Sequence, residues 1–274
     1  MGKRTENSEL RVTTRMAATD ACEGVTKADK KPGTGEAALA DGTTDAGAAT
    51  QVDGAAGAAL RQTERGLALV GDGMELICDL GRMLPRLAPG KINRELLVRA
   101  AKVKGCEAPT AIDATAGFGE DALLLAAAGF RVQLFERDEV IAALLEDGLR
   151  RAATDERLSP IVANMQLTCG DSVAALRSIA AGDFPAPDVV YLDPMFPART
   201  KSASVKKKFQ LIHHLEAPCE AEEELLRAAV AAAPRKVVVK RPAKGPALAN
   251  VKPSYAIAGK AVRYDVITPA SVKL

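Results

Sequence analysis

The chain has 274 residues, 47% of them hydrophobic, and a formal net charge of +2 at pH 7. This length suits one large domain with a small addition; no apolar run approaches the roughly 20 residues of a membrane helix, and the polar N-terminus is not typical of a secretory signal. The five scattered cysteines form no C-x-x-C pair, which disfavours a disulfide framework or zinc site and predicts buried thiols in a cytoplasmic protein.

Residues 1–91 are predicted to form a small N-terminal appendage that contains β-structure. A short strand is expected at 10–16, and the segment 17–59, rich in Ala, Gly, Thr and Asp, predicts a loop or a disordered stretch. Two β-type runs, at 66–70 and 74–78, flank a Gly-Asp-Gly turn and predict a hairpin near 66–79.

Residues 92–274 are predicted to form the main domain. Its first element is a helix at 92–103, with Asn93 as the candidate N-cap. Strands and helices then alternate, which predicts an α/β fold with a Rossmann-like, doubly wound, mostly parallel sheet. The predicted strands are 111–113, 131–136, 165–169, 188–192, 236–240 and 261–267, and the predicted helices are 121–128, 139–152, 172–180 and 220–233. Such sheets bind ligands at the carboxyl ends of their strands.

The first of these strands ends at Asp113, and the turn after it contains Gly117 and Gly119. Glycines let the backbone approach a ligand, and the helix that follows presents free N–H groups there. The turn lacks the complete G-x-G-x-x-G spacing of dinucleotide-binding folds. Because Asp113 would repel a pyrophosphate but not an ammonium or a sulfonium group, this turn is predicted to bind S-adenosylmethionine.

The next two strands also lead into acidic residues. Glu136 lies 19 residues after Gly117, where a carboxylate can accept both hydroxyl groups of a ribose. Asp171 could accept from an adenine amino group or, with Ser172, cap the next helix. Acidic residues at three successive strand ends favour a cofactor pocket over unrelated surface acids.

The fourth strand runs into the most specific pattern, V-V-Y-L-D-P-M-F-P at 189–197. This pattern resembles the (D/N)-P-P-(Y/F) motif of amino-group methyltransferases, with Met195 in the third position. An aryl amine is a poor nucleophile because its lone pair is delocalised into the ring. The Asp193 carboxylate and the Pro194 carbonyl can accept its N–H bonds, and Phe196 can stack on the base. These three residues are therefore the predicted catalytic residues.

From about residue 110 to 269 the chain resembles the ribosomal RNA small subunit methyltransferase J family. The matching segments are D-A-T-A-G-F-G-E-D (113–121), F-E-R (135–137), A-A-L-L-E-D-G-L (142–149), V-V-Y-L-D-P-M-F-P (189–197), K-S-A-S-V-K-K-K (201–208), V-V-V-K-R-P (237–242) and L-A-N-V (248–251). Ordinary methyltransferases share the first blocks, but not D-P-M-F-P together with V-K-R-P. The resemblance implies a class I methyltransferase fold and S-adenosylmethionine-dependent formation of N2-methylguanosine in 16S rRNA.

The resemblance also implies which residues bind the cofactor. The family uses the pair after the glycine turn, the pair ending the second strand, the pair after the third strand and the aspartate of D-P-M-F. In this chain these residues are Glu120, Asp121, Glu136, Arg137, Asp171, Ser172 and Asp193. The chain departs from the family pattern at Glu120, where arginine is expected. No metal is expected.

The C-terminal part of the chain is basic. From residue 199 onwards there are 15 Lys or Arg and 6 Asp or Glu residues, whereas the rest of the chain has 22 and 29. Basic residues beside the catalytic turn and after the fifth strand can neutralise phosphates near a target base, although they could also form a solvated surface. The predicted RNA-binding residues are Arg199, Lys201, Lys206, Lys207, Lys208, Lys240 and Arg241.

Three functions fit these patterns. The leading hypothesis is methylation of the exocyclic N2 of a guanosine in 16S rRNA, with the rRNA or the small ribosomal subunit as the partner. The same geometry could methylate a DNA adenine or a protein glutamine amide. A non-catalytic RNA-binding module with a relict cofactor pocket is the third hypothesis, and the presence of both Asp193 and Phe196 argues against it.

Overall fold

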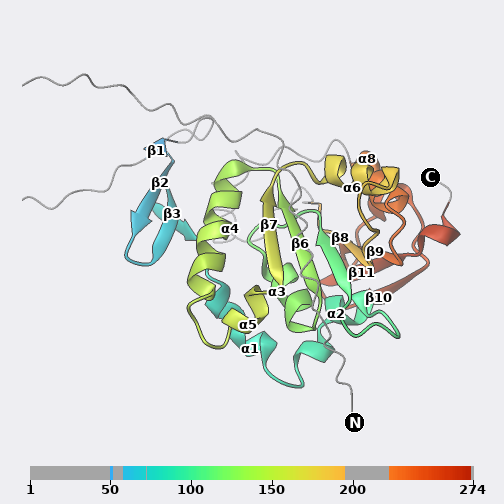
Figure 1. Ribbon diagram of the computed structural model, residues 1–274, viewed down its shortest axis with the longest axis horizontal. Coiled ribbons are helices and arrows are strands. Elements are labelled where there is room, and N and C mark those ends of the chain that lie inside the picture. The colour runs from blue at the N-terminus through green and yellow to red at the C-terminus, as the bar shows by residue number, and fades with distance from the viewer. Residues whose placement is uncertain (1–49, 52–57, 72, 195–221, 273–274) are drawn as a thin grey trace, which may run out of the picture. The chain divides into compact units, whose positions relative to one another are not determined.

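The computed structural model describes residues 50–51, 58–71, 73–194 and 222–272 (Figure 1). All of these residues belong to one compact unit, which extends from Ala46 to Leu274. The strand predicted at 10–16, most of the segment 17–59 and the D-P-M-F-P motif after Pro194 lie outside the described residues.

A seven-stranded sheet forms the centre of this unit, with the strand order β10-β11-β9-β8-β5-β6-β7 (Figure 1). The strands are β5 (Thr110–Asp113), β6 (Arg131–Glu136), β7 (Met165–Cys169), β8 (Val189–Leu192), β9 (Lys236–Pro242), β10 (Tyr255–Ala258) and β11 (Val262–Ile267). Strands β5 to β9 are parallel, whereas β10 and β11 are antiparallel at one edge. The predicted Rossmann-like, mostly parallel sheet is confirmed.

The central strands are hydrophobic on both faces because helices cover both faces of the sheet. On β8, Val189 and Tyr191 pack into one hydrophobic cluster, and Val190 and Leu192 pack into the other. The first cluster includes residues of α2 (Leu96–Ala101), α3 (Glu120–Ala127), α4 (Glu139–Ala152) and α5 (Ser159–Val162), and the second includes residues of α6 (Ser172–Ala181) and α8 (Glu222–Ala231). The alternation along each strand therefore produces the two-sided core of a doubly wound sheet.

Helix starts agree with the prediction where an aspartate caps the helix. Asp138 accepts the Val140 and Ile141 N–H groups at the start of α4, both at 2.9 Å. The helix predicted at 92–103 is wrong in part. A short 3-10 helix, η2 (Ile92–Arg94), comes first, and α2 starts after Glu95, whose backbone is extended. Asn93 is therefore not the N-cap of α2.

A second, antiparallel sheet precedes the main one. Its strands are β1 (Thr50–Gln51), β2 (Ala59–Thr63), β3 (Gly66–Gly71) and β4 (Met74–Ile77). The hairpin predicted near 66–79 is confirmed as β3 and β4. Strand β2 was not predicted, and the loop prediction for 17–59 is wrong at its C-terminal end, because β1 pairs with β2.

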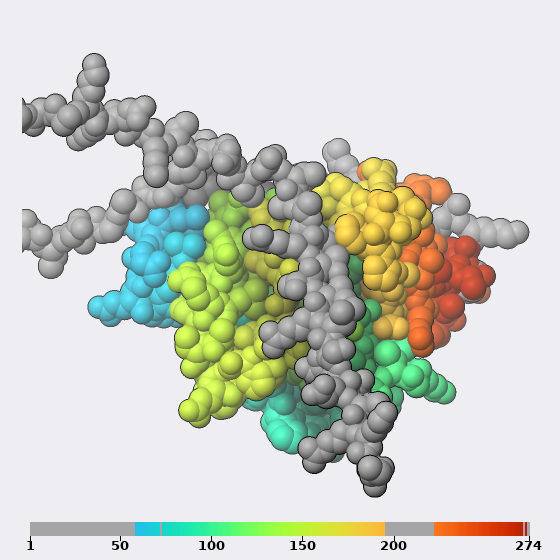
Figure 2. All heavy atoms as spheres, viewed as in Figure 1, coloured from blue at the N-terminus to red at the C-terminus, as the bar shows by residue number. Residues whose placement is uncertain are grey.

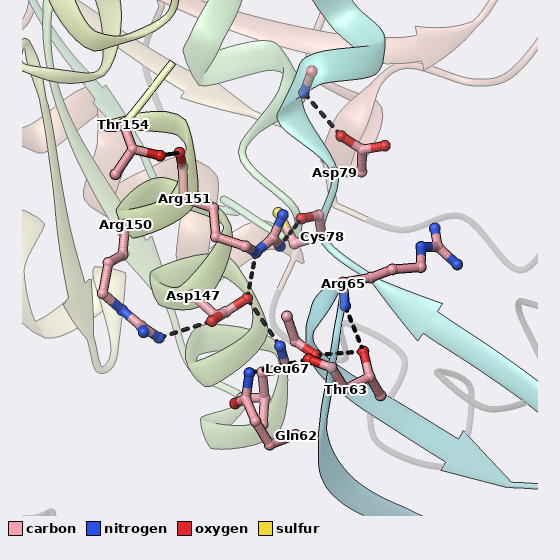
Figure 3. Close-up of polar contacts among 12 residues, drawn as sticks. Gln62, Thr63, Arg65, Leu67, Cys78, Asp79, Asp147, Arg150, Arg151 and Thr154 are labelled. Atoms are coloured by element: carbon pink, nitrogen blue, oxygen red, sulfur yellow. Dashed lines mark hydrogen bonds and ion pairs between the residues drawn. The ribbon is translucent and has the colours of Figure 1, made fainter.

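Helix α4 holds the small sheet through a buried aspartate (Figure 3). The side chain of Asp147 is 2% exposed, and it accepts the Leu67 N–H of β3 at 3.0 Å and the Arg151 Nε at 2.7 Å. Arg151 also donates to the Cys78 carbonyl, just after β4. Figure 2 shows the small sheet, in blue, lying against the yellow-green atoms of α4.

Hydrophobic residues on both sides of the predicted domain boundary at 91/92 pack into one cluster. Leu69 and Leu80 from the N-terminal side share it with Leu144 of α4 and Leu123 of α3. The division into 1–91 and 92–274 stays a prediction. The remaining short elements are η1 (Leu80–Met83), α1 (Leu84–Leu87), η3 (Leu248–Asn250) and η4 (Pro269–Ser271).

Two expectations from composition can be compared with the structure. Within the described residues, no helix has the length and apolar character needed to cross a membrane. Cys78 is buried and Cys106 is partly buried, but Cys169 is exposed, so the prediction of buried thiols is wrong for Cys169.

Candidate active site

A pocket of about 840 Å³ lies at the carboxyl ends of the parallel strands. The chain leaves β5 toward β6 on one side and returns at β8 on the other, so the β5–β8 pair is the switch point where ligands bind in open α/β sheets. Asp113 ends β5 and Asp193 follows β8, and both line the pocket. The predicted strand-end residues are therefore brought together.

The glycine turn after β5 has the backbone conformation that its sequence suggests. Gly117 and Gly119 have φ values of +52° and +71°, which side-chain-bearing residues rarely adopt. A Cβ on Gly119 would lie 2.8 Å from a Leu145 methyl carbon, so glycine there lets the turn pack against α4. No atom lies within 4 Å of the Cβ position of Gly117, which leaves the pocket side of the turn open.

Glu136 links the end of β6 to this glycine turn. Its Oε2 accepts the Gly117 N–H at 2.9 Å, and its Oε1 accepts the Asp138 N–H at 2.9 Å. A carboxylate has about four acceptor positions, so two remain for the hydroxyl groups of a ligand. Glu136 therefore shapes the turn as well as lining the pocket.

The other predicted cofactor residues also line the pocket. Asp171 caps α6 by accepting the Val173 N–H at 2.9 Å, and Ser172 is the first residue of that helix. Arg137 is exposed at the rim. Glu120, at the position where the family pattern has arginine, forms an ion pair with Arg82 of η1.

Asp193 and Pro194 are the last described residues of the catalytic motif. The Asp193 N–H donates to the Thr115 hydroxyl at 2.7 Å, which ties the end of β8 to the turn after β5. Pro194 lines the pocket beside it. Phe196 lies outside the described residues, as do Arg199, Lys201 and the lysines at 206–208.

A polar network lies between β8, α3 and β9. Lys240 donates to Asp121 at 2.6 Å and to Asp193 at 2.8 Å. The Tyr191 hydroxyl also donates to Asp121, at 2.6 Å. Lys240 was predicted to bind RNA, but its ammonium lies in the cofactor pocket between two carboxylates.

Arg241 faces away from a surface role as well. Its side chain is 1% exposed, and its guanidinium donates to the Pro246 carbonyl at 3.0 Å and pairs with Glu222 at 3.7 Å. Because a buried guanidinium is not available to a phosphate at the surface, we leave Arg241 out of the proposed RNA contacts.

The lining of the pocket is acidic. Its carboxylates are Glu75, Asp79, Asp113, Glu120, Asp121, Glu136, Asp138, Asp171 and Asp193, and its basic residues are Arg65, Arg82, Arg86, Arg137 and Lys240. Burial raises the pKa of Asp113 to about 8, and the nearby carboxylates of Asp121 and Asp193 act in the same direction. This excess of carboxylates suits a cationic ligand.

Two parts of the site were missed by the sequence patterns. The hairpin β3–β4 and η1 provide a wall of the pocket, which includes Leu76 and Ile77. No sequence motif marks this wall. Tyr191, by contrast, offered a signal, because a tyrosine inside a fully buried strand needs a partner for its hydroxyl group.

Comparison with known proteins agrees with the geometry. Residues 51–269 match a family described as "Putative SAM-dependent methyltransferase". A crystal structure of a SAM-dependent methyltransferase from Neisseria gonorrhoeae superposes with a TM-score of 0.64 at 32% identity, over 79% of this chain and 85% of that chain.

Curated relatives carry a more specific name. The ribosomal RNA small subunit methyltransferase J of Thioalkalivibrio sulfidiphilus is 46% identical over 186 residues, which cover 68% of this chain and 72% of the relative. The protein of the same name from Nitrosococcus oceani has the same identity and coverage. The chain therefore belongs to the ribosomal RNA small subunit methyltransferase J family of S-adenosylmethionine-dependent enzymes.

Proposed function

We propose that this protein transfers a methyl group from S-adenosylmethionine to the exocyclic N2 of a guanosine in 16S rRNA. The observation that carries the proposal is the placement of Asp193 and Pro194 at the switch point of the sheet, directly beside the glycine turn. The family name supports rRNA as the substrate. A ribosomal substrate also favours a cytoplasmic location.

The pocket fits the cofactor of the family. S-adenosylmethionine is a cation with a ribose and an adenine, and it supplies an electrophilic methyl group when it is bound. We propose that Asp113, Asp121 and the open side of Gly117 accommodate its amino-acid end. Glu136, with acceptor positions left beside its two backbone bonds, would accept the ribose hydroxyl groups.

Further residues complete the proposed cofactor site. Gly119 allows the turn to pack, and Glu120, Arg137, Asp171 and Ser172 line the same pocket. Since Asp171 already caps α6 through one oxygen, its other oxygen is the acceptor proposed for the adenine amino group.

The chain's own residues prepare the amine of the substrate. Asp193 and the Pro194 carbonyl would accept the two N–H bonds of the guanine amino group, which concentrates the lone pair on nitrogen and turns it toward the methyl group. Positive charge develops on this nitrogen during transfer, and the Asp193 carboxylate stabilises it. Phe196 would stack on the base, a contact worth about 1–3 kcal/mol.

The proposed RNA contacts follow the catalytic turn. Arg199, Lys201 and the lysines at 206–208 are close to Asp193 in the sequence and can neutralise phosphates beside the target base. Arg65 and Arg137 line the pocket as exposed residues, and no ion pair joins either to another described residue. The absence of a metal requirement stays a prediction.

The test is methyl transfer to defined RNA. Purified protein and methyl-labelled S-adenosylmethionine would be incubated with 16S rRNA, and separately with small ribosomal subunits, from cells that lack the gene. Digestion to nucleosides should yield labelled N2-methylguanosine, and Asp193→Ala should yield about 100-fold less or lower. Label in N6-methyladenosine or in a protein glutamine would overturn the base assignment. Absence of label from a cofactor-binding protein would favour a non-catalytic module.

A further inference from the structure

Lys240 joins two carboxylates at the base of the pocket, and neither a phosphate contact nor a purely structural role accounts for that position. We propose that Lys240 is a positioning residue for methyl transfer, which keeps the Asp193 carboxylate ionised and turned so that one oxygen faces the amine of the substrate. This inference rests on the proposed function, because it assigns Asp193 as the acceptor of the amine.

The geometry leaves the two oxygens of Asp193 in different surroundings. Lys240 Nζ binds Oδ2 at 2.8 Å, whereas no hydrogen bond to Oδ1 is found within the described part of the chain. The Asp193 N–H is held by Thr115, which restrains the backbone on the other side. With Oδ2 engaged, Oδ1 is the oxygen available to an N–H group in the pocket.

The same ammonium is itself held in place. Lys240 Nζ donates to Asp121 Oδ2 at 2.6 Å, and Tyr191 donates to that same oxygen at 2.6 Å. Asp121 lies in the first turn of α3, Tyr191 on β8 and Lys240 on β9, so three elements fix the position of the ammonium. The Lys240 side chain is only 27% exposed, which further limits its reach toward an RNA phosphate.

Charge explains why a cation is needed there. The described groups that act on Asp193 come from β5, α3, β8, β9 and β11, and they are Asp113, Asp121, Tyr191, Lys240, Arg241 and Tyr264. Burial raises the pKa of Asp193, Lys240 opposes that rise most strongly, and Asp121 adds to it. Although burial acts to lower the pKa of Lys240, Asp121 and Asp193 raise it overall, so Lys240 stays protonated.

Removing the ammonium would leave three neighbouring aspartates, at 113, 121 and 193, without their shared cation. Carboxylates this close favour uptake of a proton by one of them. A protonated Asp193 donates a hydrogen bond, whereas the amine needs an acceptor. Lys240 therefore determines the pH range in which Asp193 can assist methyl transfer.

The central variant is Lys240→Met, which removes the charge and keeps most of the side-chain volume. Lys240→Arg restores a cation and serves as the conservative variant. Lys244→Met is the matched control, because Lys244 is an exposed lysine four residues further along and no ion pair joins it to another described residue. Circular dichroism and cofactor calorimetry would establish that each variant is folded and binds S-adenosylmethionine.

Single-turnover methyl transfer would be measured from about pH 5.5 to 9 at saturating cofactor and RNA. We expect the acid limb of Lys240→Met to move upward by at least about one pH unit, which lowers the rate near pH 6.5 by about tenfold or more, with recovery toward pH 9. Lys240→Arg should restore most of the missing rate near pH 6.5. Lys244→Met should keep the wild-type profile.

A double-mutant cycle shows whether the effect acts through Asp193. In an Asp193→Asn background the side chain cannot ionise, so adding Lys240→Met should shift no limb and change the rate by less than about threefold. A separate readout needs no activity: the carboxyl ¹³C signal of Asp193, assigned by its absence in Asp193→Asn, should titrate at higher pH in Lys240→Met than in the wild type.

The outcomes separate this inference from the proposed function. If the wild type methylates rRNA but Lys240→Met keeps the wild-type acid limb and the wild-type titration of Asp193, the positioning role is wrong. A shallower salt dependence of RNA binding with an unchanged pH profile would instead make Lys240 a phosphate contact. If the wild type transfers no methyl group at all, the proposed function fails, and the ¹³C titration still tests the pairing of Lys240 with Asp193.

Discussion

Asp113→Asn is expected to stabilise the ligand-free protein at neutral pH. Asp113 is 1% exposed, and its carboxyl group has a pKa of about 8, against an ordinary value of 3.8. Its Oδ1 accepts the Thr115 N–H at 3.1 Å, a bond that an asparagine oxygen can also accept. The substitution therefore keeps the shape and the hydrogen bond but removes the ionisable group.

The magnitude follows from proton linkage. The folded protein holds a proton on Asp113 that the unfolded chain has released above about pH 4, so the free energy of unfolding of the wild type falls by about 1.4 kcal/mol per pH unit between about pH 4 and 8. Relative to Asp113→Asn, the wild type is thus destabilised by on the order of 4 kcal/mol at pH 7. Below about pH 4 this difference disappears, because the group is then protonated in both states.

Urea unfolding of both proteins from about pH 4.5 to 8 measures this difference. The gap between the two unfolding free energies should widen steadily with pH, and a constant gap would refute the buried, protonated Asp113. A cationic cofactor favours the ionised carboxylate. Calorimetry in buffers of different ionisation enthalpy should therefore detect more proton release on cofactor binding in the wild type than in Asp113→Asn.

Three further predictions concern the proposed site. Asp193→Ala should lower single-turnover methyl transfer by about 10²–10³-fold at saturating cofactor and RNA, and a rate within a few-fold of wild type would make Asp193 a structural turn residue. Glu136→Ala should weaken S-adenosylmethionine binding in calorimetry, because the substitution removes both the ribose acceptor and the acceptor of the Gly117 N–H; unchanged affinity would contradict the pocket assignment. Replacing the lysines at 206–208 with glutamine should reduce the logarithmic slope of RNA affinity against salt by about 0.7 to 0.9 for each phosphate that is no longer neutralised, with cofactor affinity unchanged; the same slope as wild type would mean that these lysines face away from RNA.

The sequence predicted the centre of the fold well because its signals there are local. The runs V-V-Y-L and V-V-V-K are buried on both faces, and a continuous hydrophobic run is what a central parallel strand requires. The capping aspartates at 138 and 171 marked two helix starts. The edge strand β10 was missed because Y-A-I-A is mostly exposed and has no hydrophobic face.

Long-range contacts account for the other differences. The helix expected at 92–103 is interrupted at Glu95, whose carboxylate accepts two bonds from Arg86, at 3.0 and 2.7 Å. Lys240 was assigned to RNA because a lysine at a strand end resembles a phosphate contact. Its two carboxylate partners lie 119 and 47 residues away in the sequence, and only the folded sheet brings them together.

The attachment of the small sheet to α4 has a thermodynamic consequence for the pocket. Leu76 and Ile77 form part of the pocket wall, and the strand that carries them is attached through Leu67, Asp147 and Arg151. A ligand that contacts this wall binds only molecules in which the sheet is attached, so its apparent affinity scales with the fraction of such molecules. By reciprocity the ligand protects the Leu67 amide from hydrogen exchange. Residues on the far side of α4, remote from any methyl group, thereby contribute to the dissociation constant of whatever occupies the pocket.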